Sequence, residues 1–470
     1  MGSFENFIFN VAVICIAFGA ANVTLRLIQV AFCMLRANAH TVREQVLDYK
    51  KYISEDNLIP VSFIVPTYNS EHDIVGCIER ILGVDYVNSE IIIVNDGSTD
   101  STLEVISEYF ELEEIEYSIK TSIPTKKIRS VYYSKKYPNI LVVNKSKGGR
   151  FDAANCGINV SQYPLIICLD VSSYLEKDSV LKLAVEFLKN SYTVMSSGFV
   201  RLTAKNENGD YKSPRNRFPV SLSEGFEAMR CIKAASTDKM NAFTYNFLFS
   251  GTGSFAVFAK QAIIDVGGYS VDVADAHLDL LYKISNFFAK NKRKYKFVLH
   301  HDVICRTGND YSSRAVIERY KEWQTGLLDA LLCRQWRTLA HPFRDFKMFL
   351  SGIYNWMFEV INVLLIVVSV IAIPIALIAG VISFKLVLCY ILFVFFLNLN
   401  TNFGAFLVEL NIDNISRHHC RMYIKIAFLD NFGFRLKLLF ARFATILSYS
   451  RPSRRAKLAA KKAKRQAQNI

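Results

Sequence analysis

Three long runs of apolar residues constrain this chain more than any other feature of its sequence. Residues 7–25 are nearly uncharged, and residues 358–380 and 386–408 form two further runs joined by a short turn. Each run is long enough to cross the hydrocarbon core of a bilayer as a helix. The sequence therefore predicts a transmembrane anchor within residues 1–35, two transmembrane helices within residues 349–410, and a separate domain between them.

Basic residues set the expected orientation of these segments. Arg36, Arg43, Lys50 and Lys51 follow the first apolar run, and the segment SRHHCRMYIK follows the third. Lys and Arg concentrate in cytoplasmic loops, so we expect an integral protein of the plasma or inner membrane whose domain and tail are cytoplasmic. The ten cysteines are scattered without a CxxC pair, which fits reduced thiols in that location.

The carboxyl-terminal part of the chain is apolar at first and then strongly basic. Residues 421–449 carry charges at Asp430, Arg435 and Arg442, too many for an easy span, so they predict an interfacial helix with a span as the alternative. The tail, residues 450–470, has no acidic residue and could bind anionic lipid or be a solvated helix. It lacks the aromatic and basic interleaving typical of nucleic-acid binding, so no nucleic-acid partner is expected.

Between the apolar runs, segments rich in β-forming residues alternate with amphipathic helical segments. Residues 61–65, 90–94 and 140–143 are predicted strands, and residues 72–82 are a predicted helix. This alternation is typical of an α/β domain with a mostly parallel sheet. We place the domain at residues 55–345.

The densest group of functional signals lies in residues 141–175. A glycine-rich turn at Gly148 and Gly149 leads into a predicted helix, and a buried strand at residues 164–169 ends at Asp170. Because α/β folds bind their ligands at the carboxyl ends of strands, Asp170 is a candidate functional residue. The alternative is that Asp170 caps a helix or lies in a loop.

Several segments, taken in order, resemble membrane-bound family 2 glycosyltransferases, the group that contains the cellulose, chitin, hyaluronan and poly-N-acetylglucosamine synthases. FIVPTYNSE and EIIIVNDGSTDST resemble the two opening elements of that family, GGRFDAANCGI its GGKADALNAGI element, and CLDVSS its DxD strand; FSGTGSF, VGGY, an LDL run and WQTG follow. The resemblance covers residues 61–380. It implies a GT-A fold (nucleotide-diphospho-sugar transferase, Rossmann-like) in the α/β domain, joined to transmembrane α-helices.

The resemblance also implies a donor site. A UDP-sugar would give up a hexosyl residue, and Mg²⁺ or Mn²⁺ would neutralise its diphosphate. Asp170 matches the first metal ligand of the DxD motif, whereas Ser172 replaces the second Asp and is a poorer ligand. By position, the residues that contact the donor would be Pro66, Tyr68, Glu71, Asp96, Arg150, Asp152 and Asp170.

The motif that normally supplies the catalytic base departs from the family pattern. Asp275, Ala276 and His277 align with its TED, so His277 stands where the catalytic Asp is expected. His277 could act as the base, because imidazole titrates near neutral pH, or it could join Asp170 in a metal site. Asp275 or Asp279 could instead supply the carboxylate. The structural alternative is that Asp275 caps a helix and His277 is an ordinary exposed histidine.

The segments that the resemblance assigns to acceptor binding give a weaker indication of function than the donor segments do. The resemblance places Gly251 of FSGTGSF and Trp323 in the acceptor site, and Trp323 is the residue of the QxxRW motif that this chain retains. Trp323 could stack on the acceptor sugar or anchor the interface between domain and membrane.

Two hypotheses of different classes follow. The first is an active membrane glycosyltransferase that moves a hexosyl residue from a UDP-sugar to a glycan or lipid acceptor. The second is a catalytically silent paralogue that keeps the fold and acts as a structural or regulatory subunit of a polysaccharide-synthesis complex. Asp96, Asp152 and Asp170 support donor binding in both, whereas Ser172 and His277 favour the second. The expected partners are membrane lipid, the UDP-sugar, a glycan acceptor and other subunits of such a complex.

Overall fold

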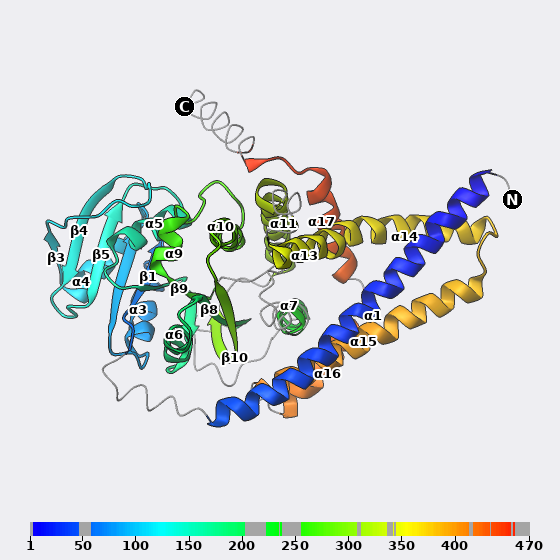
Figure 1. Ribbon diagram of the computed structural model, residues 1–470, viewed down its shortest axis with the longest axis horizontal. Coiled ribbons are helices and arrows are strands. Elements are labelled where there is room, and N and C mark those ends of the chain that lie inside the picture. Colours follow the sequence, from blue (N-terminus) through cyan, green and yellow to red (C-terminus); the bar gives the residue numbers. More distant parts are fainter. Residues whose placement is uncertain are drawn as a thin grey trace.

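The computed structural model describes residues 3–46, 58–202, 222–234, 236, 255–307, 312–335, 342, 345–412, 417–432, 434–452 and 455. A mixed α/β domain occupies one end of the molecule and long helices extend from the other (Figure 1). Gly251 and most of the tail at residues 450–470 lie outside the described residues.

In the described part of the chain, ten strands form one sheet. They are β1 (Val61–Thr67), β2 (Ser89–Asn95), β3 (Leu112–Ile115), β4 (Ile128–Ser134), β5 (Ile140–Lys145), β6 (Leu165–Cys168), β7 (Ser173–Leu175), β8 (Thr193–Leu202), β9 (Ala256–Ala259) and β10 (Lys296–Thr307). Their order is β3-β4-β5-β2-β1-β6-β9-β8-β10-β7. The central strands β5, β2, β1 and β6 are parallel, as predicted, but β3, β4, β7 and β9 pair antiparallel with their neighbours. The sheet is therefore mixed, in part because β4 and β5 follow each other through a short hairpin.

Helices cover both faces of this sheet (Figure 1). They are α3 (Ile74–Leu82), α4 (Thr102–Phe110), α5 (Arg150–Val160), α6 (Ser179–Lys189), α9 (Lys260–Asp265) and α10 (Ala276–Lys290). Alternate residues of β1 enter two separate cores: Phe63 and Val65 pack with α3, α4 and α6, and Ile64 packs with α5, α9 and α10. A strand as apolar as β1, with the run Phe63–Pro66, is expected where a parallel strand is buried on both faces.

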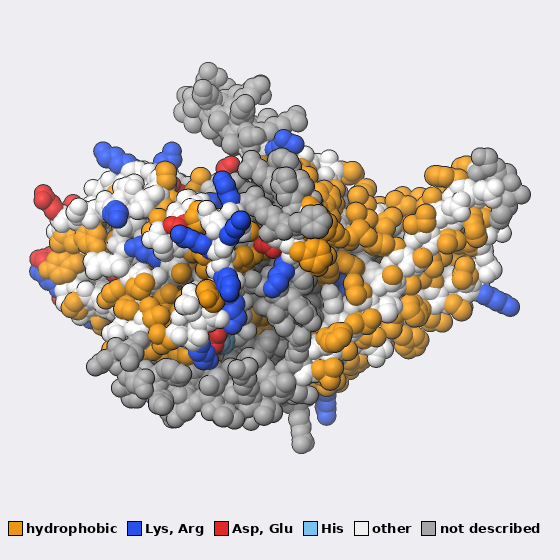
Figure 2. Space-filling model, viewed as in Figure 1, with side chains coloured by type: hydrophobic (Ala, Val, Ile, Leu, Met, Phe, Trp, Pro, Cys, Tyr) orange, Lys and Arg blue, Asp and Glu red, His pale blue; other side chains and the backbone are white. Residues whose placement is uncertain are grey.

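Within the described residues, three helices are long and apolar enough to cross a membrane, at Phe4–Leu35, Phe346–Ile378 and Phe384–Leu410. They belong to α1 (Ser3–Val46), to α13 (Phe346–Asn355) with the π-helical turn η4 (Trp356–Ile361) and α14 (Asn362–Ile378), and to α15 (Phe384–Ile412). α1 packs against α14 and α15. Hydrophobic side chains cover much of the visible face of these helices (Figure 2). The three apolar runs of the sequence thus form the predicted helices.

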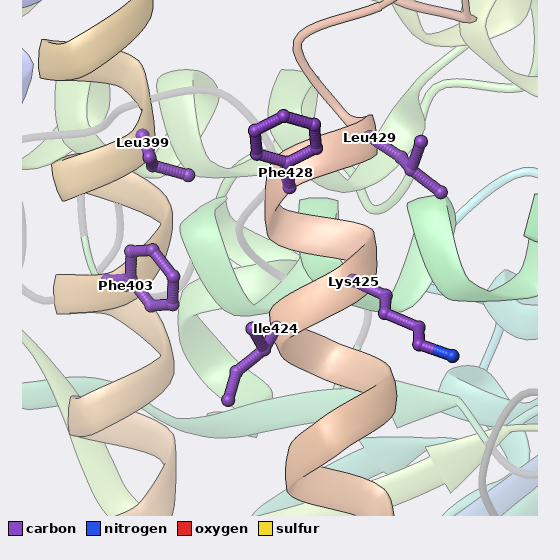
Figure 3. A pocket seen from close by; sticks show the side chains of 6 residues that line it. All are labelled: Leu399, Phe403, Ile424, Lys425, Phe428 and Leu429. Atoms are coloured by element: carbon purple, nitrogen blue, oxygen red, sulfur yellow. The ribbon is translucent and has the colours of Figure 1, made fainter.

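The prediction of one helix over residues 421–449 is wrong. The chain forms α16 (Arg417–Leu429) and α17 (Phe434–Leu447), separated by a turn that begins at Asp430. The break allows two different contacts: α16 packs against α7 (Leu222–Ala234) and α15, whereas α17 packs against α11 (Ser313–Asp329) and α14. An open groove of about 410 Å³ between α15 and α16 is lined by Leu399, Phe403, Ile424, Lys425, Phe428 and Leu429 (Figure 3).

Candidate active site

The candidate site lies where β1, β2, β5 and β6 end, because parallel strands bring their carboxyl ends to one edge of the sheet. Hydrogen bonds join the loops that follow β1 and β2. The Thr99 amide donates to Asn69 Oδ1 at 2.9 Å, and the Ser101 amide donates to Glu71 Oε2 at 3.0 Å. Asn69 adopts a left-handed φ of 50°. Glu71, predicted to contact the donor, therefore holds the two loops together.

Pro66 and Tyr68 lie beside each other at the end of β1. Pro66 pairs with Val94 of β2, and the Tyr68 side chain is exposed. Lys147 Nζ lies 3.7 Å from the centroid of the Tyr68 ring, and a hydrogen bond from Lys147 lowers the pKa of the Tyr68 phenol. An exposed aromatic ring at this edge could stack on a nucleotide base. The exposure of Tyr68 is compatible with its predicted role in donor binding, which stays a prediction.

Asp96 and Asp152 share one buried counterion, Lys145. Lys145 Nζ lies 2.6 Å from Asp96 Oδ1 and 2.6 Å from Asp152 Oδ2, and its side chain has no exposed surface. The amides of Gly148 and Gly149 donate to the two carboxylate oxygens of Asp96 at 2.9 and 2.7 Å. Gly149 has a φ of 96°, which glycine adopts readily. Asp96 thus holds the glycine-rich turn through both of its oxygens.

Asp170 is tied to the same turn through Arg150, the first residue of α5. Arg150 Nη2 lies 2.7 Å from Asp170 Oδ1, and the side chains are 45% and 43% exposed. Asp170 lies in the turn between β6 and β7, where its carbonyl accepts a hydrogen bond from the Ser173 amide, so the loop alternative holds and no described helix begins there for it to cap. The segment of Gly148, Gly149 and Arg150 therefore brings Asp96, Asp152 and Asp170 into one neighbourhood.

The oxygen ligands near Asp170 do not form a built cation site. Mg²⁺ and Mn²⁺ prefer several oxygen ligands, with carboxylates foremost. Asp170 already pairs with the Arg150 guanidinium, and Ser172 offers only a hydroxyl. Among the described residues, no group of three His, Cys, Asp or Glu side chains is placed to hold a metal. We therefore assign no reaction step to a metal.

His277 is buried, which corrects the alternative of an exposed histidine. Its side chain packs between Phe151 and Tyr269, with ring centroids 5.2 and 5.4 Å away. Burial, with a smaller effect from Arg150, lowers the pKa of His277 to about 3. Neither ring nitrogen has a hydrogen-bond partner among the described residues. An imidazole in this state is neutral and could accept a hydrogen bond from a ligand.

The two neighbouring carboxylates already have structural partners. Asp275 caps α10 by accepting a hydrogen bond from the Leu278 amide at 3.1 Å, as the structural alternative predicted, and burial raises its pKa. Asp279 is buried and accepts a hydrogen bond from the Ser270 hydroxyl at 2.5 Å. Of the three predicted catalytic residues, His277 is the one whose polar atoms lack such a partner in the described structure.

Trp323 lies on α11, partly buried at the junction between the domain and the membrane helices. The Arg442 guanidinium of α17 lies 5.0 Å from its ring centroid. Arg442 also donates to Gln324 Oε1 at 2.7 Å and to Glu359 Oε2 at 2.7 Å. This environment supports the anchoring alternative for Trp323, and its role in acceptor binding stays a prediction.

Sequence reasoning did not single out Lys145, Gly326 or Arg442. Lys145 follows a predicted strand, and a charged residue at the end of a strand could have indicated that it belongs to the site. Gly326 lets α11 approach the α10 cap, because a Cβ there would lie 2.3 Å from Asp275 Cβ. Arg442 was counted as a charge unfavourable to a span, but nothing in the local sequence showed that Glu359 would neutralise it.

The sequence of the chain is similar to those of known glycosyltransferases. Residues 62–267 match the family described as Glycosyl transferase family 2. Poly-beta-1,6-N-acetyl-D-glucosamine synthase of Staphylococcus epidermidis is 23% identical over 227 residues, 48% of this chain and 46% of the relative. The synthase of Staphylococcus aureus strain COL is 25% identical over 238 residues, 51% and 48% of the two chains. The chain thus aligns with about half the length of these curated relatives.

A solved structure shows the same fold. A mannosyltransferase from Pyrobaculum calidifontis, in complex with GDP-Man and Mn²⁺, is 16% identical and matches with a TM-score of 0.50 over 93% of this chain and 99% of that chain. Residues 62–267 thus form a domain similar to glycosyl transferase family 2, with a GT-A fold, and this domain is joined to helices long and apolar enough to cross a membrane.

Proposed function

We propose that this protein is a membrane-anchored glycosyltransferase that moves a hexosyl residue from a UDP-sugar to a glycan or lipid acceptor at the cytoplasmic face. One observation carries the proposal. Hydrogen bonds and ion pairs join Asp96, Asp152 and Asp170 to a single segment, residues 145–150, at the carboxyl edge of the parallel strands. Sites of this kind in α/β folds receive nucleotide ligands.

The residues of this segment could have two different roles in donor binding: some would offset charge, and others would hold the shape of the turn. In hexosyl transfer, the acceptor oxygen bonds to the anomeric carbon while the bond to the diphosphate breaks, so negative charge builds up on the leaving group. The positive charge of Arg150 and the amino-terminal end of α5 would offset that negative charge. Lys145 and Asp96 hold the glycine-rich turn in the required shape. The proton of the acceptor hydroxyl would pass to a ring nitrogen of His277.

The low pKa of His277 favours a second candidate function. A group with a pKa of about 3 is a weak base, whereas general bases work best when their pKa lies near the working pH. Asp275 and Asp279 are engaged in a helix cap and a buried hydrogen bond. These features fit a silent subunit that binds donor and partner proteins of a polysaccharide-synthesis complex without turnover.

The two candidates are separated by an assay of UDP release. The full chain in lipid nanodiscs would be incubated with a panel of UDP-sugars and oligosaccharide or lipid acceptors, with and without Mn²⁺. UDP release that disappears in His277→Ala but persists in Lys136→Ala, a change at an exposed hairpin distant from the site, supports the transferase. Donor binding without release in every condition supports the silent subunit. A chain that binds no nucleotide contradicts both.

A further inference from the structure

We infer that Arg150, rather than a divalent cation, supplies the positive charge that holds the donor diphosphate in this chain. The inference rests on the proposed function, since it concerns the donor of the same site. It makes donor binding independent of added metal, although the mannosyltransferase that shares the fold was obtained with Mn²⁺.

The position of Arg150 suits a diphosphate. Its guanidinium is 45% exposed and is oriented by Asp170 at 2.7 Å. A guanidinium has five N–H donors in a fixed plane, so it can keep one carboxylate while binding phosphate oxygens with its other donors. Asp170 therefore serves as the group that positions Arg150, in the place where the family resemblance implies a metal ligand.

The backbone next to Arg150 leaves room for a ligand. A Cβ added to Gly149 would meet no atom within 4 Å, whereas one added to Gly148 would lie 2.1 Å from Asp152 Oδ2. The turn thus packs against the protein at Gly148 and borders open space at Gly149. Arg150 also begins the eleven-residue helix α5, whose amino-terminal end favours negative charge.

A cation at Asp170 would meet two obstacles. The guanidinium occupies Asp170 Oδ1, so a divalent ion would have to displace Arg150 or bind beside its positive charge. The second position of the DxD motif is Ser172, whose neutral hydroxyl adds little affinity for Mg²⁺ or Mn²⁺. Arg150 needs neither a free Asp170 nor a second carboxylate to bind a diphosphate, because Asp170 already holds its guanidinium in place.

The test compares binding of UDP and of uridine to the full chain in nanodiscs by isothermal titration calorimetry. With the wild-type chain, we expect the Kd for UDP in EDTA to lie within about threefold of the Kd in excess Mn²⁺, less than 1 kcal/mol. Arg150→Ala should weaken UDP by about 10- to 100-fold, the loss of one charge-assisted interaction, and should leave uridine unchanged. Arg150→Lys should retain part of the UDP affinity. GDP and guanosine would be run in parallel.

Two results would overturn the inference. One is UDP binding that requires Mn²⁺. The other is a pattern in which Asp170→Asn abolishes UDP binding while Arg150→Ala has no effect, as expected of a metal ligand. In both cases uridine would still bind, and the proposed function would stand. A chain that binds neither diphosphates nor nucleosides contradicts the proposed function and the inference together.

Discussion

Replacing Lys145 with methionine tests the ion cluster that shapes the glycine-rich turn. Lys145 is fully buried, and its ammonium lies 2.6 Å from both Asp96 and Asp152, whose side chains are 4% and 8% exposed. Methionine keeps most of the length of the side chain and removes the charge. Removing one partner of a buried ion pair typically costs about 3–5 kcal/mol, because the remaining charge is left without compensation. In this case two carboxylates would be left without their shared cation.

This loss should be visible in thermal unfolding of the full chain in detergent, followed by intrinsic fluorescence. For a domain of 150–250 residues, 1 kcal/mol corresponds to about 2–4 °C, so Lys145→Met should lower the unfolding temperature by roughly 6–20 °C. Lys147→Met is the matched control, since Lys147 is exposed in the same segment and its loss should cost less than about 0.5 kcal/mol.

A compensating variant makes the interpretation specific. Asp96→Asn and Asp152→Asn, added to Lys145→Met, remove the unpaired charges and should restore much of the lost stability. A Lys145→Met variant that unfolds within 2 °C of the wild type would refute the reasoning. A triple variant no more stable than Lys145→Met would show that packing, and not charge, accounts for the loss.

Three further predictions concern stability. The pKa of His277 is about 3 in the folded chain against 6.5 unfolded, so its contribution to stability is present above pH 6.5 and decreases as the pH falls towards 3. The wild type should therefore lose about 2 kcal/mol of stability from this residue between about pH 7 and about pH 5, and His277→Phe should remove that loss. Equal slopes of stability against pH in the two chains would contradict this. Gly326→Ala should lower stability by about 1–3 kcal/mol, because its Cβ would lie 2.3 Å from Asp275 Cβ, and an unchanged unfolding temperature would count against this close approach. Arg442→Met should cost about 3–5 kcal/mol by leaving Glu359 buried without its cation, and recovery in a double variant with Glu359→Gln would support that cause.

Local sequence rules predicted the parts of the site that local geometry determines. A glycine pair before a helix and an aspartate after a short apolar strand were enough to locate Gly149 and Asp170, because strand ends and tight turns have recognisable residues. Lys145 was missed because its burial depends on β2 and β5 being neighbours, and residues 97–144 separate it from Asp96 in sequence. His277 was given an exposed alternative because Phe151 and Tyr269, which cover it, come from distant segments.

Contacts between distant segments also explain the wrong prediction for residues 421–449. That prediction considered only whether the charged side chains of this segment would lie in water or in lipid. In the structure, several of these charges meet opposite charges from elsewhere. Arg442 of α17 pairs with Glu359 of η4, and Asp430 lies 3.4 Å from Lys233 of α7, whose pKa burial lowers to about 7.

Similar ion pairs join the α/β domain directly to the apolar helices and to the chain end. Arg201 of β8 lies 2.5 Å from Glu409 of α15, and Arg455 pairs with Asp329 of α11. Each pair would leave an uncompensated buried charge if its two segments separated, at a cost of several kcal/mol. The α/β domain and the helices are therefore bound together by paired charges as well as by apolar contact. In the proposed transferase, a donor site on this domain would therefore keep a fixed position relative to the apolar helices.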